Sequence, residues 1–434
     1  MREMKDSGID WIGNVPSEWR NSKVKHIASF YNGDRSKAYP SGDDIKTSGV
    51  PFLTSDNVHG LYVETGRKKD KFLSDAKYRE LNGAKLQIGD IVFCLRGSLG
   101  ACGLNLNLKE GTVASSLTVL RPNQDEVIPE FLNYCLHSPV VLIQTDYLMN
   151  GSCADNLSAH SVGNYCICIP PMQEQCQITR YLDERCAAIN EDVAKRREVI
   201  EKLKEYKKSL IAHAVTKGLD PNVEMKASGV EWIGEVPASW DMLRIYQLAF
   251  PVKNKNEGMK ENNLLSLSYG NIVQKDINKV DGLVPASYEG YNIIEPGDIV
   301  LRFTDLQNDQ RSLRTGLCSF NGIITSAYLT IRPRHELVSS EYFHYVLHFV
   351  DTLKVFYNMG GGMRQSLDWH GVSHMFLPIP PQAEQCRIVA YLDERCAAID
   401  EAVSRQEKLI EKLGEYRKSI IHHAVTGKID CTEA

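Results

Sequence analysis

Two blocks of this sequence occur twice, and this internal repeat limits the possible folds more than any other feature. The first block, MKDSGIDWIGNVPSEW at residues 4–19, returns as MKASGVEWIGEVPASW at residues 225–240. The second block runs from Ile169 to Asp220 and returns from Ile379 to Asp430, at an offset of 210 residues. A period of this length indicates a duplicated domain rather than a solenoid of short repeats. We name the blocks the tryptophan motif and the helix block.

The helix block predicts one long helix in each copy. Pro170-Pro171 suits a first helical turn, where the missing N–H would have no intrahelical partner, and Gly218 and Gly427 lie just past the expected ends. Between these limits apolar residues recur at steps of three and four, the heptad pattern of a coiled coil. The predicted pairing seam comprises Leu182, Cys186, Ile189, Val193, Ile200, Leu203, Leu210, Leu392, Cys396, Ile399, Val403, Ile410, Leu413 and Ile420.

Each predicted helix has about 40 residues, which is roughly 60 Å of helix at ~1.5 Å per residue. Neither helix can bury its apolar stripe alone, so we expect the two helices to pack on each other. Antiparallel pairing would place the modules at their ends far apart, related by an approximate two-fold axis. The alternative is that each stripe belongs to an ordinary core helix within its own globular domain.

The stretches between the repeated blocks differ in sequence but share a framework. Residues 112–123 and 323–334 each alternate like a strand and end in Arg-Pro, and a short amphipathic helix follows each. We therefore predict mixed α/β (α+β) modules, two in tandem with pseudo-two-fold symmetry, joined by two long antiparallel coiled-coil helices. The expected segments are a first module at residues 1–168, a first spacer helix at 169–217, a linker with the second module at 218–378, and a second spacer helix with a tail at 379–434.

The link between the first helix and the second tryptophan motif has a counterpart at the ends of the chain. Joining the C-terminal TGKIDCTEA to the N-terminus would reproduce the internal link TKGLDPNVEMKASG in outline. The chain thus resembles a ring of two equivalent units opened at one junction, and we expect its termini to lie close together. Because Trp11, Trp19, Trp232 and Trp240 belong to the copied motifs, we expect them to pack the modules onto the helices.

The overall composition limits the classes of protein to which this chain can belong. The net charge of −5 is unlike that of a simple non-specific DNA-binding protein, which would be basic. No run of eighteen apolar residues occurs, and the N-terminus lacks the apolar core of a secretory signal, so we expect a cytoplasmic protein. The twelve cysteines include no C-x-x-C pair of the zinc-finger type, and we expect free thiols.

Sequence signatures of catalysis are missing. There is no phosphate-binding G-x-x-x-x-G-K-[ST] loop, and no Asn-Pro-Pro-Tyr or Asp-Pro-Pro-Tyr of the kind expected in amino-methyltransferases. His344 and His348 stand at i, i+4, but no Glu follows the first histidine, so the zinc-protease pattern fails. We therefore expect a binding protein with no catalytic or metal-ligating residues.

The order of these parts resembles the specificity subunit of type I restriction–modification systems. The matching residues are WIG-VP--W in both tryptophan motifs, IPP--EQC-I--YLDE at both helix starts, and EKL-EY-KS-I-HAVT at residues 201–216 and 411–426. The resemblance covers essentially the whole chain. It implies two target-recognition domains, each reading one half of a bipartite asymmetric DNA site, and paired helices that set the length of the unread spacer.

The resemblance also implies that this subunit is not an enzyme, holds no cofactor and works in the cytoplasm of a prokaryote. Its expected partners are double-stranded DNA, two modification subunits and restriction subunits, with no membrane. Adenine-N6 methylation with S-adenosylmethionine and ATP-dependent cleavage with Mg would reside in those partners. Two other hypotheses stay open: a non-catalytic adaptor or scaffold that binds other macromolecules, and the specificity part of a single-chain restriction–methylation enzyme.

Side-chain chemistry nominates the residues that would touch DNA. Arg, Lys, Asn and Gln are the usual readers of base edges, assisted by Ser and Thr. The candidates in the first module are Ser55, Asn57, Arg67, Lys68, Lys69, Arg96, Ser98 and Ser152. Those in the second are Ser268, Asn271, Arg302, Thr304, Arg311, Arg314, Arg364 and Gln365. The alternative for each is a solvated surface group or a phosphate contact.

Overall fold

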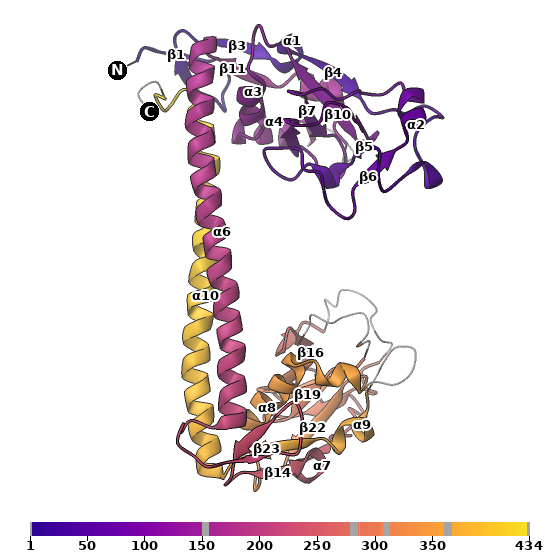
Figure 1. Ribbon diagram of the computed structural model, residues 1–434, viewed down its shortest axis with the longest axis vertical. Helices are drawn as coiled ribbons and strands as arrows, with labels where there is room; N and C mark the ends of the chain where they lie inside the picture. Colours follow the sequence, from indigo (N-terminus) through magenta and orange to yellow (C-terminus); the bar gives the residue numbers. More distant parts are fainter. Residues whose placement is uncertain are drawn as a thin grey trace. The chain divides into compact units, whose positions relative to one another are not determined.

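The structure is a computed structural model that divides the chain into two compact units (Figure 1). Unit 1 combines Met1–Arg196 with Glu407–Ala434, and unit 2 is Arg197–Gln406. Because the division falls within both long helices, each unit contains one module and a part of each helix. The described residues are 2–149, 156–277, 285, 287–304, 306, 313–359 and 367–431.

Unit 1 is built on two sheets of four and three strands, with two further strand pairs, β1-β2 and β3-β11. The four-stranded antiparallel sheet has the order β4-β10-β7-β8, and the three-stranded sheet β6-β5-β9 includes one parallel pair, β5 with β9. Its elements are β1 (Met4–Asp6), β2 (Asn14–Pro16), β3 (Arg20–Lys23), α1 (Val24–Ile27), β4 (Ala28–Asn32), η1 (Gly42–Asp44), β5 (Val50–Leu53), η2 (Ser55–Asn57), β6 (Lys71–Leu73), α2 (Asp75–Glu80), β7 (Ile91–Cys94), β8 (Cys102–Leu104), β9 (Thr112–Val113), β10 (Leu117–Pro122), α3 (Pro129–Leu136), α4 (Pro139–Met149), α5 (Ala159–Gly163), β11 (Cys166–Ile169) and the first part of α6 (Met172–Lys217).

Unit 2 repeats this plan with different loops. Its sheet β15-β22-β19-β20 matches the four-stranded sheet of unit 1, and in β17-β16-β21-β18 the parallel pair is β16 with β21. Its elements are β12 (Met225–Ala227), β13 (Glu235–Pro237), β14 (Asp241–Arg244), α7 (Ile245–Leu248), β15 (Ala249–Pro251), β16 (Leu264–Ser268), β17 (Asn271–Lys275), β18 (Asn292–Ile294), β19 (Ile299–Leu301), β20 (Thr315–Leu317), β21 (Gly322–Ile324), β22 (Leu329–Pro333), α8 (Ser340–Thr352), η3 (Val355–Asn358), α9 (Trp369–Ser373), β23 (Phe376–Ile379) and the first part of α10 (Gln382–Val425).

One sequence-based expectation was wrong in both modules. Residues 112–123 form two strands rather than one, because a turn closed by the hydrogen bond from Leu117 N to Ala114 O separates β9 from β10. The two strands then join different sheets. Residues 323–334 divide in the same way into β21 and β22. Alternation of side chains continues across the turn, so the pattern alone did not show the break.

The long helices α6 and α10 pack against each other within each unit. In unit 1, the core that contains Leu182 and Cys186 of α6 also contains Ile420 and Ala424 of α10. In unit 2, Ile211 of α6 shares a core with Leu392 of α10. Two domains joined by paired antiparallel helices are therefore the architecture of the chain (Figure 1). None of the described helices combines the length and apolarity that a membrane span requires.

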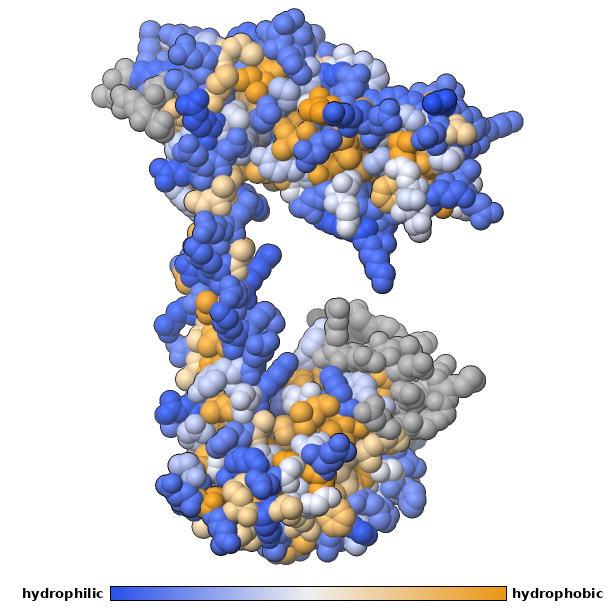
Figure 2. All heavy atoms as spheres, in the orientation of Figure 1, coloured by the Kyte–Doolittle hydropathy of each residue, from blue (hydrophilic) through white to orange (hydrophobic). Residues whose placement is uncertain are grey.

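The fourteen seam residues all face inward to some degree. Leu182, Cys186, Ile189, Ile200, Leu392, Cys396, Ile399 and Ile420 are buried, and the other six are half-buried. The outer faces are mainly polar (Figure 2) and carry i, i+4 ion pairs such as Glu198–Lys202 and Glu401–Arg405.

Both ends of the chain belong to unit 1, as the circular arrangement of repeats led us to expect. Gly427, with φ +68°, lies so close to the N-terminal segment that an added Cβ would be 2.3 Å from Pro16 Cδ. Cys431 is buried in the core of the same unit. In unit 2, Gly218 (φ +74°) takes the equivalent place beside Pro237 and Trp240. The C-terminal segment therefore completes the module that the N-terminal segment begins.

Candidate nucleic-acid interface

A repeated set of buried polar contacts fixes each module to the start of its long helix. Trp19 Nε1 donates to Glu174 Oε2 at 3.0 Å, and Trp240 Nε1 donates to Glu384 Oε2 at 3.1 Å. Both indoles are fully buried, whereas Trp11 and Trp232 are half-buried against the same cores. The expectation that the copied tryptophans pack the modules onto the helices is confirmed for Trp19 and Trp240.

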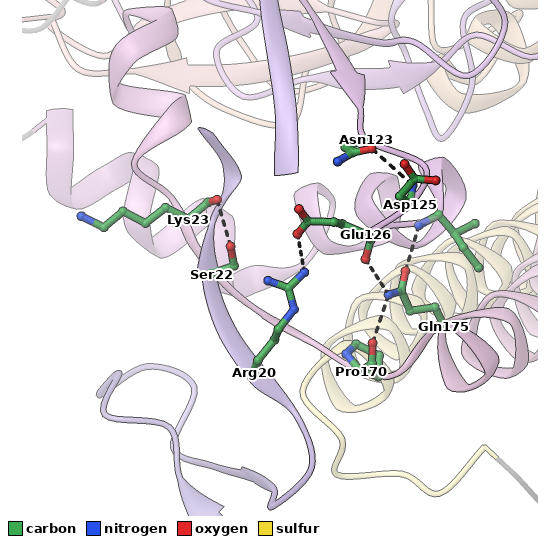
Figure 3. Close-up of polar contacts among 9 residues, drawn as sticks. Arg20, Ser22, Lys23, Asn123, Asp125, Glu126, Pro170 and Gln175 are labelled. Carbon is green, nitrogen blue, oxygen red and sulfur yellow. Dashed lines mark hydrogen bonds and ion pairs between the residues drawn. The ribbon is translucent and has the colours of Figure 1, made fainter. Parts of the chain in front are cut away.

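The next residue of each helix is a buried glutamine that serves three backbone groups. Gln175 Oε1 accepts from Ile128 N at 2.8 Å, and Gln175 Nε2 donates to Glu126 O and Pro170 O at 3.1 and 3.0 Å (Figure 3). Gln385 repeats the arrangement, accepting from Ser339 N at 2.9 Å. These contacts hold the connection before α3 or α8 against the helix start, so loops that differ between the units stand on the same frame.

A tyrosine on α3 or α8 adds a further shared contact. Tyr134 Oη donates to Asp183 Oδ1 at 2.6 Å, and Tyr345 Oη donates to Asp393 Oδ1 at 2.7 Å. Burial, the larger cause, and the adjacent carboxylate together raise the pKa of both tyrosines far above the ordinary value. Both phenols therefore remain protonated donors at neutral pH.

The candidates of the first module fall in two places. Ser55, Asn57, Arg67, Lys68 and Lys69 belong to the connection between β5 and β6, and Arg67, Lys68 and Lys69 are exposed. Arg67 Nη1 donates a hydrogen bond to the backbone oxygen of Asp56 at 2.6 Å, and this bond stabilises the connection. Ser55 is half-buried. This connection therefore presents an exposed basic run beside a partly covered hydroxyl.

Arg96 and Ser98 are exposed in the connection between β7 and β8. Arg96 lines a cleft of about 410 Å³, whose other lining residues are Asn32, Arg35, Asn156, Leu157, Ser158, Ala159 and His160. Arg35 also borders a neighbouring cleft of about 520 Å³ that is lined by residues 30–36 and 82–84. Two guanidinium groups at one cleft are suited to phosphate oxygens or to the O6 and N7 atoms of guanine.

No sequence pattern had singled out Arg35, Asn32 or His160 as candidates. They are exposed and lie near Arg96 only through the fold, since β4, the β7–β8 connection and α5 converge at the cleft. Next to Arg35, the Ser36 hydroxyl lowers the pKa of buried Asp34, and that carboxylate accepts hydrogen bonds from the backbone of Ser36 and Asn82 at 2.6 and 2.7 Å. The loop that carries Arg35 is thereby held in place.

The candidates of the second module lie on corresponding elements. Ser268 and Asn271 face each other across the last pair of the β16–β17 hairpin, the counterpart of the β5–β6 connection. Arg302 and Thr304 are half-buried after β19, the counterpart of β7. Ser152, Arg311, Arg364 and Gln365 lie outside the described residues.

Two candidates have side chains that are engaged inside the fold. Asn57 is buried, and its amide donates to Glu64 O and Asp70 Oδ1, each at 3.0 Å. Arg314 is fully buried, with Nη1 donating to Thr304 O at 2.9 Å and Nε donating to Tyr357 Oη at 3.3 Å. Both residues hold loops in place in this conformation, and neither presents its polar atoms to the surface.

The described residues contain no group of three or more His, Cys, Asp or Glu side chains arranged to hold a metal ion. Burial lowers the pKa of His344 and of His348 to about 4, which leaves both imidazoles neutral at neutral pH. The eleven cysteines within the described ranges are free thiols.

Known proteins share both sequence and fold with this chain. Residues 16–202 match the type I restriction modification DNA specificity domain. Over 96% of its length the chain is 23% identical to the putative type I restriction enzyme MjaX specificity subunit of Methanocaldococcus jannaschii, of which it covers 95%. The chain is thus similar to the specificity subunits of type I restriction–modification systems. The EcoKI specificity subunit of Escherichia coli is a further similar protein, 25% identical over 40% of this chain and 39% of that one.

Solved structures from type I systems share the fold of this chain. One, from a study of complex assembly and conformational transition of a type I R-M system, superposes with a TM-score of 0.70 at 16% identity, covering 96% of this chain and 99% of that one. The HsdS subunit of Thermoanaerobacter tengcongensis gives a TM-score of 0.50 at 17% identity, covering 96% and 98%.

Proposed function

We propose that each unit of this specificity subunit reads one half of a bipartite, asymmetric site in double-stranded DNA. The observation that carries the proposal is that unlike loops stand at matching places on a shared frame. The connection between the antiparallel strands is a long loop with the basic run Arg67-Lys68-Lys69 after β5, and a two-residue turn after β16. Rigid scaffolds that present variable loops are typical of recognition proteins. Unlike loops imply unlike half-sites.

In unit 1 the proposed contacts are Arg67, Lys68 and Lys69, together with the cleft that contains Arg35 and Arg96. In unit 2 they are Ser268, Asn271, Arg302 and Thr304. Ser152, Arg311, Arg364 and Gln365 remain candidates on chemical grounds alone. Asn57 and Arg314 are left out of the reading set and assigned to loop support, because their polar atoms are engaged inside the fold.

We also propose that α6 and α10 fix the length of the unread spacer, and that the repeated surfaces dock two modification subunits and the restriction subunits. Tyr206 in unit 2 and Tyr416 in unit 1 are repeat equivalents, 57% and 52% exposed, so each unit offers the same residue to a partner. Partners that contact phosphates would make the chain's net charge of −5 compatible with DNA binding.

The chain itself is then non-catalytic and needs no cofactor. Adenine-N6 methylation with S-adenosylmethionine, and ATP- and Mg-dependent cleavage, reside in the partner subunits. The test is methylation-aware sequencing of cells in which the gene is present or deleted, with the modification subunits expressed in both. A bipartite methylated motif that disappears on deletion is the expected result; an unchanged methylation pattern would refute the proposal.

A further inference from the structure

The β16–β17 hairpin of unit 2 ends in an unusual two-residue tip, Tyr269-Gly270. Both residues have positive φ, +47° and +82°, as a type I′ turn requires. Asparagine, aspartate or glycine normally occupies the first of these positions, because a large side chain on a left-handed backbone costs on the order of 1 kcal/mol or more. The turn therefore keeps a tyrosine where its backbone disfavours one.

The Tyr269 ring contributes little to the packing of unit 2. It is 81% exposed, the highest value among the exposed large apolar side chains of the described residues. A side chain that strains the backbone without adding core contacts points to a role outside the fold.

Buried residues of unit 2 pack against the hairpin and hold its tip in place. Leu265, Leu267 and Ile272 of the hairpin are buried in one core cluster. Gly270 lies against Leu313, since a Cβ added to Gly270 would be 3.0 Å from Leu313 Cδ1. Gly316 of β20 approaches the hairpin in the same way, with an added Cβ 2.5 Å from Leu267 Cδ1. The ring is thus presented on a fixed support.

The residues beside the tip are polar. Ser268 and Asn271 pair directly across the hairpin, and Asn271 is exposed. A hydroxyl and an amide therefore flank the aromatic ring, and both are groups that hydrogen-bond to base edges.

We infer that this hairpin enters the major groove of the half-site read by unit 2, and that the Tyr269 ring contacts the C5 methyl group of a thymine there. The inference rests on the proposed function. A two-stranded ribbon fits the ~12 Å major groove, and the thymine methyl is the apolar group that base edges present in that groove. The corresponding connection of unit 1 is a long loop of different sequence, so this contact belongs to the half-site read by unit 2.

The first experiment determines the methylated motif with the full chain co-expressed with its modification subunits. Tyr269→Ala and Tyr269→Gly should relax one A·T position in one half-site and leave the other half-site intact. Tyr269→Phe should keep the wild-type motif, because the ring remains. Tyr246→Ala, which removes another exposed tyrosine of unit 2, is the matched control and should change nothing.

Tyr269→Gly also separates reading from folding. Glycine adopts positive φ without strain, so this variant should melt at or above the wild-type temperature while losing the same discrimination as Tyr269→Ala. A relaxed motif in a protein of full thermal stability supports a direct contact.

The second experiment uses duplex probes of the wild-type motif in which each thymine of that half-site is replaced in turn by uracil, which lacks the methyl group. At one position the affinity of the wild-type complex should fall about fourfold, the equivalent of one buried methyl group at ~0.8 kcal/mol. The affinity of the Tyr269→Ala complex should not respond to that replacement.

Three outcomes would overturn the contact: an unchanged motif in Tyr269→Ala, no response of the wild type to any uracil, or equal losses in Tyr269→Phe and Tyr269→Ala. The last would indicate a hydroxyl contact to phosphate. The proposed function fails separately, if the wild-type complex shows no bipartite motif at all.

Discussion

Lys207 of α6 forms an ion pair with Asp400 of α10, with Nζ 2.7 and 2.6 Å from the two carboxylate oxygens. The repeat places Arg417 and Asn190 at the equivalent positions in unit 1, where Arg417 Nη1 donates to Asn190 Oδ1 at 3.1 Å. The same antiparallel register therefore holds in both units. Lys207 and Arg417 stand as basic residues within the apolar stripe of their helices. Each forms a polar contact with the other helix of the pair.

The difference between these two contacts predicts a stabilising substitution. Asn190→Asp would give unit 1 the ion pair that unit 2 has, and should raise the free energy of unfolding by up to about 1 kcal/mol, as expected for a largely exposed pair. Asp400→Asn should lower it by a similar amount. Urea denaturation at low salt measures both, and the difference should shrink in 1 M salt because the pairs are exposed. Equal midpoints for all three proteins would contradict the expectation.

Loss of the buried glutamine should loosen a module from its helix. Gln175→Leu would leave Ile128 N, Glu126 O and Pro170 O without their side-chain partner, at a cost of about 1–3 kcal/mol for each unsatisfied buried group. The melting temperature should fall, and Gln385→Leu should behave alike in unit 2. Gln173→Leu, on the exposed side of the same helix, is the control. A melting temperature as high as that of Gln173→Leu would show that these bonds add little.

Removing single arginines should affect one half-site at a time. Arg35→Ala or Arg96→Ala should weaken or relax the half-site read by unit 1, and Arg302→Ala should do the same for unit 2, by about 1–3 kcal/mol if the contact is to a base. The change of motif is measured by methylation-aware sequencing, with Arg79→Ala, exposed on α2, as the control. An unchanged motif and unchanged DNA affinity would remove the residue from the interface.

Longer helices should change the spacer and leave the half-sites alone. Four helix-favouring residues inserted after both Arg196 and Gln406 add ~6 Å of helix, which is at most about two base-pair steps of ~3.4 Å. The methylated motif should therefore gain one or two unread base pairs. Replacement of four exposed residues at the same places, without an insertion, is the control. Altered half-site bases with the original spacer would refute the measuring role of the helices.

Unit 2 should lose stability in mild acid. Burial lowers the pKa of His344 and His348 to about 4 in the folded protein, and Lys207 and Lys208 act in the same direction on His348. Unfolded histidine titrates near ~6.5, so between these values the unfolded chain binds more protons. The free energy of unfolding should therefore decrease as the pH is lowered from about 6.5 to about 4, by up to ~1.4 kcal/mol per pH unit for each histidine.

Denaturation at pH 7.5, 6 and 5 tests this expectation. His348→Gln should reduce the slope by about half, and His335→Gln, whose side chain belongs to the turn after β22, should not change it. A wild-type slope as shallow as that of His348→Gln would contradict the prediction.

The paired helices could be predicted because a heptad stripe needs a partner and the repeat supplied one. Other features depend on the fold. The turn at Ala114–Leu117 divides one alternating stretch between two sheets, and α4 lacks an amphipathic pattern, so neither was foreseen. Asn57 and Arg314 were predicted to contact DNA because of their residue type. Both are buried, and their side chains donate hydrogen bonds within the fold. Arg35 meets Arg96 only after β4 and the β7–β8 connection come together.

The joining of both chain ends in unit 1 has a consequence for synthesis on the ribosome. Every residue of unit 2 has been translated once Gln406 has left the tunnel, whereas unit 1 waits for Glu407–Ala434. The module of unit 1 is therefore translated first but completed last. A nascent chain whose translation ends early lacks the C-terminal residues that cover the apolar core of unit 1. Protein quality control would find such prematurely terminated products through that open core.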